Sequence, residues 1–278
     1  MGLNAYRAAV KARIDAELNL RVEQWFPTLP ATHAEALRTI LGEGKRLRGS
    51  LTCLAAEALG GTLEQALPAA LAVEMVQAAS LVHDDFVDGD TVRRGRPAAW
   101  TVLSARRALL LADVMFATAI EHMAQAGGRQ GATLAHAIAA MAQGALQESL
   151  RKEAPEPDAY RRIIYLKTGS LFAAAARLGA LAAGAHESML EAATEFGARV
   201  GELYQIADDL ADGARLGSLN AQSEFGVLVA QARRALAAFP DNECTRMLAD
   251  MPEELLRISV WAPAALTGGQ KRSRNRTR

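Results

Sequence analysis

Two clusters of aspartates, each at the end of an apolar run, constrain this chain more than any other feature. They are Asp84, Asp85 and Asp88 in DDFVD, and Asp208, Asp209 and Asp212 in DDLAD. In a helix, residues four apart lie on the same face, so the first and last aspartates of each cluster point the same way. Crowded carboxylates repel one another unless a cation lies between them. Mg²⁺ takes oxygen ligands and commonly bridges carboxylates to substrate phosphates.

The repetition of the cluster favours a metal site over a solvated acidic helix end, which one such pentapeptide alone would also fit. Two clusters of the same shape indicate two walls of one cavity. They lie far apart in the sequence, so only a folded bundle could bring them together. Helix bundles build metal and cofactor sites in this way, from side chains that project inward from facing helices.

The remaining sequence favours a helical fold. Apolar residues make up 50% of the chain and aromatic residues only 5%. Alanine and leucine dominate, which is typical of helices packed closely through small side chains. Glycine and proline bound long helical segments, and no segment alternates with a period of two. We predict an all-α, single-domain bundle of long, mostly antiparallel helices around a central cavity over residues 1–268, and a basic, disordered tail over 269–278.

Hydrophobic periodicity and the positions of glycine and proline predict where the helices lie. The predicted helices cover residues 4–24, 32–41, 47–59, 68–88, 101–125, 130–152, 158–182, 187–212, 221–238 and 243–259. Pro68 is expected in the first turn of its helix, where its missing N–H costs nothing. The RRGRP segment contains Gly95 and Pro97 and is predicted to be a loop.

Charge and cysteine usage exclude several classes of protein. Lys+Arg and Asp+Glu both number 31, so the net charge does not indicate a nucleic-acid partner or a membrane surface. Cys53 and Cys244 lack metal-ligand spacing and fit buried thiols in a reducing compartment. The N-terminus lacks the apolar core of a signal peptide, and Asp113 and Arg177 interrupt the two best candidates for a membrane span. We expect a soluble, cytoplasmic protein.

Clustered cations near the aspartates indicate that anions bind. Lys45, Arg46 and Arg48 lie at the start of a predicted helix, where the helix dipole disfavours cations. An anion bound at that helix end would explain them, although a solvated basic turn is the alternative. Arg93 and Arg94 follow the first aspartate cluster, and guanidinium groups match diphosphate oxygens with two hydrogen bonds.

Taken in order, these motifs resemble those of trans-isoprenyl diphosphate synthases, the polyprenyl synthetase family. The matching pieces span roughly residues 40–215 and are GKRLRG at Gly44–Gly49, Gln77, DDFVD at Asp84–Asp88, RRGRP at Arg93–Pro97, KTG at Lys167–Gly169 and QIADDLAD at Gln205–Asp212. The resemblance implies the isoprenoid synthase fold, a homodimer and about three Mg²⁺ per active site. It also implies a prenyltransferase that condenses isopentenyl diphosphate with an allylic diphosphate, head to tail (1'-4).

The resemblance assigns roles to single residues. The six aspartates would be metal ligands and, with Lys167, catalytic residues. Isopentenyl diphosphate would be bound by Gly44, Lys45, Arg48, Gln77 and Arg94. The allylic diphosphate would be bound by Arg93, Lys167 and Thr168, and Gln205 would also contact substrate. Gly169 would permit a close approach or a kink. Arg96 is expected to face solvent, and His83 is expected to pack beside the first cluster.

The number of diphosphate sites separates chain elongation from terpene cyclisation. An elongating enzyme needs two such sites and a cyclase needs one, and the cations Lys45, Arg48 and Arg94 would supply the second. Ala79 and Ser80, just before the first cluster, are small where short-chain members of the family often place an aromatic floor. We therefore expect a product of C20 or longer. The alternative is a floor set deeper, at Val76 or on a neighbouring helix.

Departures from the family pattern keep two other hypotheses open. The segment after Asp212, GARLGSLNAQSEFG, looks shortened and has no lysine, with Arg215 as its only cation. The usual Gly-Gln pair reads Gly144–Ala145. In the first hypothesis the chain is a weakly active or regulatory subunit that needs a partner synthase. In the second it is a class I terpene cyclase. Retention of all six aspartates argues against the first alternative, and the two basic sets argue against the second.

Overall fold

The computed structural model describes residues 2–42, 44–150, 155–213 and 219–260 of the chain. Within these residues the fold is all-α, as predicted, apart from one two-stranded hairpin. The helices are α1 (Leu3–Trp25), α2 (Ala31–Gly42), α3 (Leu47–Ala58), α4 (Leu63–Val87), α5 (Ala99–Leu103), α6 (Ala105–Ala126), α7 (Gly128–Ser149), α8 (Pro157–Ile164), α9 (Ser170–Ala182), α10 (Glu187–Ala211), α11 (Ala221–Ala235) and α12 (Glu243–Val260). The predicted tail at 269–278 and Arg215 lie outside the described residues.

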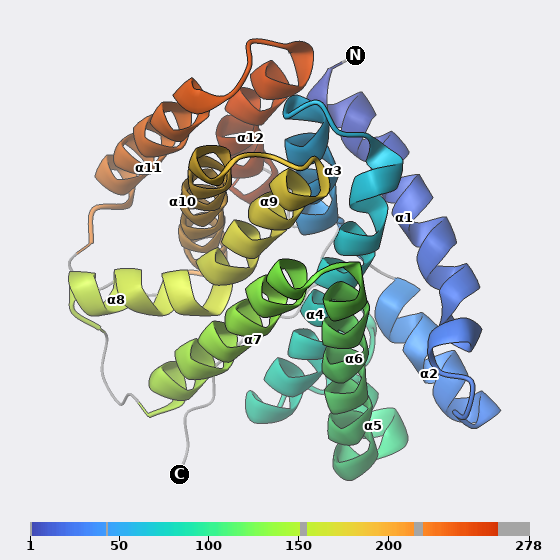
Figure 1. The fold of residues 1–278 in the computed structure, drawn as a ribbon. Coiled ribbons are helices and arrows are strands. Elements are labelled where there is room, and N and C mark those ends of the chain that lie inside the picture. The colour runs from blue at the N-terminus through green and yellow to red at the C-terminus, as the bar shows by residue number, and fades with distance from the viewer. Residues whose placement is uncertain (1, 43, 151–154, 214–218, 261–278) are drawn as a thin grey trace.

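The core is built around α3, α4 and α9, which pack against one another in the middle of the bundle. Figure 1 shows the other helices around them, with α1 and α2 on one side, α6 and α7 on another, and α10 to α12 on a third. Most residues of α9, whose sequence is SLFAAAARLGALA, are buried. Alanine and glycine let the helix axes approach closely, so the alanine-rich composition has its expected structural meaning.

Helix α4 carries the first aspartate cluster and starts earlier than predicted. Thr62 and Gln65 form a capping box, with Thr62 Oγ1 accepting from the Gln65 N–H at 3.2 Å and Gln65 Oε1 accepting from the Thr62 N–H at 2.9 Å. This cap fixes the helix start at Leu63. Pro68 therefore lies inside the helix, on its exposed side, and the prediction of Pro68 in the first turn is wrong.

Helix α4 is also long and apolar enough to cross a membrane by length and composition alone, which the sequence analysis did not predict for any segment. Of its most apolar window, 72% is buried inside the fold. It contacts α3, α6 and α9, so it is packed as a core helix of the bundle.

The predicted loop at 93–97 is a β-hairpin of β1 (Val92–Arg93) and β2 (Arg96–Pro97), with Arg93 paired to Arg96. The two residues between the strands, Arg94 and Gly95, have φ of 51° and 77°. Positive φ at both central residues is the signature of a type I′ turn, whose twist matches that of the strands. The hairpin therefore presents Arg94 at its tip.

Two long predicted helices are interrupted. The segment 101–125 is divided at Ser104, which has a φ of 76° and separates α5 from α6. The segment 158–182 contains a π-helical turn, η1 (Tyr165–Gly169), between α8 and α9. A short 3-10 turn, η2 (Leu236–Ala238), follows α11. Turns of the π type often mark functional sites, and this one contains Lys167 and Thr168.

Candidate active site

Both aspartate clusters lie at the C-terminal end of a 25-residue helix. In each cluster two aspartates occupy the last turn and the third is the C-cap residue: Asp84, Asp85 and Asp88 on α4, and Asp208, Asp209 and Asp212 on α10. A helix C-terminus carries a partial negative charge, so carboxylates are electrostatically disfavoured there. Placing three of them at each of two such ends makes physical sense if cations bind between them.

The side chains of the first cluster are crowded and partly desolvated. Asp85 is buried, and its Oδ1 accepts a hydrogen bond from Arg93 Nε at 2.6 Å. Burial raises the pKa of Asp85, and the Arg93 guanidinium opposes that shift. Burial also raises the pKa of Asp84, against the effect of Lys167. Arg93, which was predicted to bind the allylic diphosphate, therefore forms a hydrogen-bonded ion pair with a carboxylate of the first cluster.

The π-turn η1 reaches toward both clusters through consecutive side chains. Lys167 Nζ donates to Glu148 Oε2 on α7 at 2.5 Å. Burial disfavours the charged ammonium, but Glu148 and Asp84 outweigh it and raise the pKa of Lys167. Thr168 Oγ1 points the other way and donates to Gln205 Oε1 on α10 at 2.6 Å. The charge of Lys167 thus acts on the first cluster, and Thr168 contacts the helix that carries the second.

Two glycines allow η1 to fit between its neighbouring helices. A Cβ on Gly144 of α7 would lie 2.7 Å from the backbone nitrogen of Lys167. A Cβ on Gly201 of α10 would lie 2.8 Å from the Cα of Gly169. Because real Cβ atoms do not approach so closely, any larger residue would displace the turn. Gly144 and Gly201 therefore permit the close approach of the helices to η1, whereas a Cβ on Gly169 itself would lie 3.1 Å from Tyr165 Cδ2. The role that the resemblance implies for Gly169 stays a prediction.

The second cluster is held by groups that sequence reasoning partly missed. Gln205 Nε2 donates to Asp209 Oδ1 at 3.0 Å, and the Tyr160 hydroxyl of α8 donates to Asp209 Oδ2 at 2.7 Å. Burial and then the charge of Asp209 raise the pKa of Tyr160, so its hydroxyl stays a donor. Tyr160 lies outside the motifs that carried the resemblance, and no spacing in the sequence indicates its contact with Asp209 on another helix.

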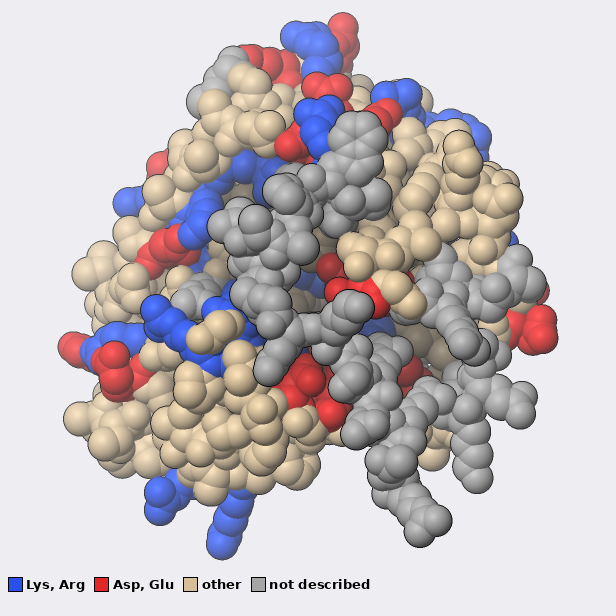
Figure 2. Space-filling model, turned by 180° about the vertical axis from the view of Figure 1, so that it is seen from behind, with Lys and Arg blue, Asp and Glu red and all other residues tan. Residues whose placement is uncertain are grey.

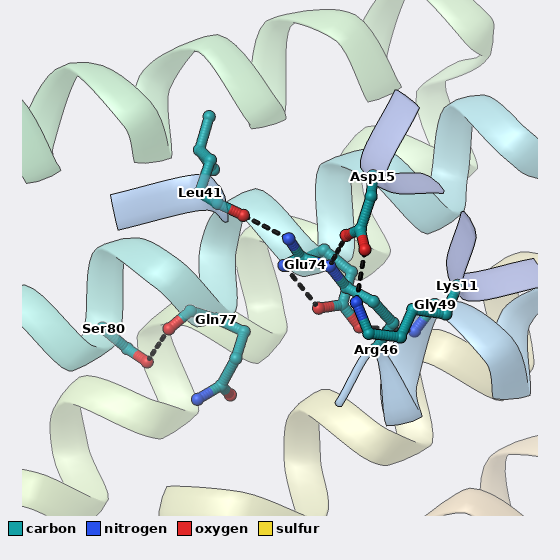
Figure 3. A network of polar contacts seen from close by, with 8 residues as sticks. All are labelled: Lys11, Asp15, Leu41, Arg46, Gly49, Glu74, Gln77 and Ser80. Carbon is teal, nitrogen blue, oxygen red and sulfur yellow. Dashed lines mark hydrogen bonds and ion pairs between the residues drawn. The ribbon is translucent and has the colours of Figure 1, made fainter. Parts of the chain in front are cut away.

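Arg46 differs in role from the neighbouring cations of the GKRLRG loop. It is buried, with a left-handed φ of 50°, and its Nε donates to Asp15 Oδ1 at 2.7 Å. Figure 3 shows its other contacts, with the Leu41 carbonyl and with Glu74 Oε2 at 3.5 Å. Glu74 Oε1 also accepts from the Gly49 N–H at 2.8 Å. Arg46 is therefore a structural tie between α1, α2 and α4, and it holds the backbone between Lys45, in the preceding loop, and Arg48, in the first turn of α3.

The other cations of the predicted second diphosphate site lie toward α10. The Arg48 guanidinium lies 4.3 Å from the centroid of the Phe172 ring. Burial lowers the pKa of Arg48, and nearby Tyr204 opposes this shift. Burial raises the pKa of Tyr204, and both Arg48 and Arg94 oppose it. The charges of Arg48, from α3, and of Arg94, at the hairpin tip, thus both act on the pKa of Tyr204 of α10, against that of Asp208 in the second cluster. Lys45 is exposed.

The remaining predicted residues lie on or near α4. Gln77 is half-buried, and its backbone carbonyl accepts from Ser80 Oγ at 2.9 Å (Figure 3). Ala79 is fully buried. A Cβ on Gly44 would lie 2.9 Å from Arg46 Nη1, so this glycine leaves room for the buried arginine. His83 packs edge-on against the Phe116 ring, with centroids 5.5 Å apart, in keeping with a packing role.

The donor types fit a hard divalent cation. Carboxylate oxygens are the ligands that Mg²⁺ prefers, and both helix ends add negative charge. Within the part of the chain that the structure describes, no group of three histidine, cysteine, aspartate or glutamate side chains converges as a ready-made metal site. Figure 2 shows acidic side chains near the centre of one face of the molecule, beside Lys and Arg side chains.

The described residues thus form an all-α protein in which two aspartate motifs end separate helices and cations lie on α3, on the hairpin and on the π-turn. Residues 30–216 match the model of the family described as "Polyprenyl synthetase", and the chain belongs to this family. The resemblance seen in the sequence is thereby confirmed.

Known relatives agree with this assignment. The chain is 39% identical over 168 residues to geranylfarnesyl diphosphate synthase of Methanosarcina mazei, which covers 60% of this chain and 57% of that protein. It is 31% identical over 236 residues to the short chain isoprenyl diphosphate synthase of Methanothermobacter thermautotrophicus, covering 80% and 73%. The match thus spans little more than half the length of the first relative.

Solved structures confirm the isoprenoid synthase fold. The polyprenyl synthase from Caulobacter crescentus, solved in complex with calcium and isoprenyl diphosphate, superposes with a TM-score of 0.79. It is 23% identical, and the similarity covers 92% of this chain and 97% of that one.

Proposed function

We propose that this protein is a Mg²⁺-dependent prenyltransferase that condenses isopentenyl diphosphate with an allylic diphosphate, head to tail, to a longer prenyl diphosphate. The observation that carries the proposal is η1, where Lys167 lies near the first aspartate cluster and Thr168 binds the helix of the second. A diphosphate held between two carboxylate clusters needs cations and hydroxyl donors at such a position. The names of the relatives, all prenyl diphosphate synthases, support the same reaction class.

In this proposal the six aspartates hold about three Mg²⁺, which when bound would neutralise charge on the departing diphosphate. Lys167 and Arg93 lie beside the first cluster, where they add positive charge at the allylic diphosphate. Thr168 and Gln205 supply neutral polar groups next to Asp209. No side-chain nucleophile is required.

The proposed reaction exchanges one bond for another. The allylic C–O bond breaks, the double bond of isopentenyl diphosphate attacks the resulting cation, and a proton leaves to the released diphosphate. Water would quench the cation, so the apolar side chains around α4 must exclude it. The part of this helix that precedes the aspartates buries Val76, Ala79 and Val82.

Elongation is favoured over cyclisation because the cations form two sets. One set, Arg93 and Lys167, lies at the first cluster. The other, Arg48 and Arg94, lies near Tyr204, and we assign it with Lys45, Gly44 and Gln77 to isopentenyl diphosphate. All six aspartates are retained, and Asp85 and Asp209 accept hydrogen bonds from neighbouring side chains, which favours an active enzyme over a regulatory subunit. The family's lysine after Asp212 would fall in a segment that the structure describes only in part.

Product length, assembly and location are further parts of the proposal. Small side chains at Ala79 and Ser80 support a product of C20 or longer. A homodimer is supported by α6, where Leu110 and Val114 are 56% and 44% exposed and lie one turn apart. Burial of α4 in the core supports a soluble, cytoplasmic enzyme.

Steady-state kinetics with both substrates test the proposal. Arg48→Gln should raise KM for isopentenyl diphosphate about tenfold or more and leave KM for the allylic primer nearly unchanged, because it removes a charged contact at one site. Lys167→Gln should raise KM for the allylic primer, leave KM for isopentenyl diphosphate nearly unchanged and lower kcat. Arg129→Gln removes an exposed cation bound to Glu187 and serves as the control. A wild-type chain that consumes the allylic diphosphate alone and releases a hydrocarbon would support a cyclase instead.

A further inference from the structure

Tyr160 is a buried tyrosine outside every motif that carried the family resemblance. It lies on α8, with 6% of its surface exposed. The inward face of α8 consists of Tyr160, Ile163 and Ile164, at the spacing of one helical face. Packing of these side chains holds the phenol ring in place, so its hydroxyl has little freedom to move away from its partner.

The hydroxyl of Tyr160 is part of a directional network on the second aspartate cluster. It donates to Asp209 Oδ2 at 2.7 Å, while Gln205 Nε2 donates to Asp209 Oδ1 at 3.0 Å. The other end of the Gln205 amide accepts from Thr168 Oγ1 at 2.6 Å. A carboxylate accepts hydrogen bonds and a hydroxyl can donate, so each donor and acceptor in this chain of contacts has a defined direction.

The network joins α10 to the α8–η1 segment at two places. Tyr160 and Thr168 both belong to that segment, and Gln205 and Asp209 lie one turn apart on α10. Each oxygen of the Asp209 carboxylate therefore accepts a hydrogen bond from a side chain that is fixed in turn. Packing on α8 fixes Tyr160, and the hydrogen bond from Thr168 fixes Gln205. A carboxylate offers about four lone-pair positions, so the hydrogen bonds from Tyr160 and Gln205 do not by themselves exclude a metal on the same group.

We propose that Tyr160 is a positioning residue for the prenyl-transfer reaction, which fixes the Asp209 carboxylate for metal and diphosphate. This inference rests on the proposed function. Groups that orient a metal ligand by hydrogen bonding typically change metal affinity 10- to 100-fold when they are removed. Tyr160 acts through Asp209 and needs no contact with substrate.

The test compares two tyrosine variants that lose the same chemical group. Tyr160→Phe removes the hydroxyl on Asp209 and keeps the ring. Tyr6→Phe removes the hydroxyl of another buried tyrosine, which donates to the Glu57 carboxylate of α3, and is the matched control. Both variants are first compared with the wild type by thermal unfolding, and binding is measured below the lowest transition.

Binding of Mn²⁺ in the presence of inorganic diphosphate is followed by electron paramagnetic resonance, and the rate is followed against Mg²⁺ concentration. We expect Tyr160→Phe to weaken Mn²⁺ binding about tenfold and to raise the Mg²⁺ concentration for half-maximal rate by a similar factor. Saturating Mg²⁺ should restore most of kcat. Tyr6→Phe should match the wild type in both measurements.

The outcomes separate the two levels of the argument. If the wild type binds Mn²⁺ with diphosphate and Tyr160→Phe binds it equally well, the positioning role is wrong while the proposed function stands. An equal loss in both variants would also overturn the role, because it would reflect stability alone. If the wild type binds neither metal nor diphosphate, the proposed function fails and this inference fails with it.

Discussion

At the scale of single residues, the proposal makes product length depend on the side chains just before the first aspartate cluster. Ala79 is fully buried on α4, between the aspartates and the deeper core residues Val76 and Met75. In the proposed function, a small side chain at this position would allow a growing prenyl chain to pass along α4. The resemblance predicted a role in chain length for this position from its spacing to Asp84, and that role stays a prediction.

Replacing Ala79 by a large ring should shorten the product. We expect Ala79→Phe to move the main product down by one or more isoprene units, since the ring fills space on the inner side of α4. Ala9→Phe, on the exposed side of α1, is the control. Products are dephosphorylated and sized by mass, and an unchanged product spectrum in Ala79→Phe would rule out this position as the floor.

Glu202 on α10 gives a prediction about stability and pH. It is 7% exposed, and burial raises its pKa to about 7 although Arg199 Nη1 donates to it at 2.6 Å. The folded chain therefore binds a proton that the unfolded chain has already lost above its usual pKa of 4.5. Stability must then fall as pH rises from about 4.5 through 7.

The Glu202→Gln variant has no titratable group at this position, so it should not show this loss of stability with rising pH. Relative to the wild type, its free energy of unfolding should rise by about 2 kcal/mol between pH 5 and pH 8. Urea unfolding at the two pH values measures this difference. Glu195→Gln removes an exposed carboxylate bound to the same Arg199 and controls for the ion pair. A Glu202→Gln difference that does not vary with pH would contradict the prediction.

At the scale of secondary-structure elements, the π-turn η1 links the two aspartate clusters. It lies between α7 and α10 because Gly144 and Gly201 have no side chains to block it. The turn rotates consecutive residues toward different helices, so Lys167 faces Glu148 and Thr168 faces Gln205. The geometry of the site therefore depends on close backbone contact at this element.

A methyl group on Gly144 should displace η1. Gly144→Ala places Cβ 2.7 Å from the backbone nitrogen of Lys167, and overpacking of this kind typically costs about 1–3 kcal/mol. We expect lower stability in urea unfolding and a higher KM for the allylic primer. The control is Gly128→Ala in the same helix, where no atom lies within 4 Å and where alanine should leave stability unchanged or slightly raised. Equal behaviour of the two variants would show that η1 tolerates the change.

The sequence predicted the helices better than their interruptions. Apolar periodicity and helix-breaking residues placed the long helices within a few residues, because these signals are local. The early start of α4 was missed because Pro68 looked like a first-turn residue, whereas Thr62 and Gln65 cap the helix. The type I′ turn at Arg94 requires a left-handed arginine, which sequence patterns do not favour.

At the scale of the whole molecule, the fold and the aspartate motifs were predictable from the sequence. The side-chain contacts that hold the candidate site residues in place were not. Motif order alone indicated the family, which residues 30–216 confirm. The contacts of Tyr160 with Asp209 and of Glu148 with Lys167 join separate helices. Neither contact leaves a spacing pattern in the chain, so only the tertiary structure reveals them.

The most direct test of the central claim is to incubate the purified protein with Mg²⁺, isopentenyl diphosphate and each of three allylic primers of increasing length. Products are dephosphorylated and sized by mass. We expect a ladder of prenyl alcohols that ends at a defined length of C20 or more. No elongation from any primer, by a folded protein that binds Mg²⁺ and diphosphate, would contradict the claim that this chain alone is a prenyl diphosphate synthase.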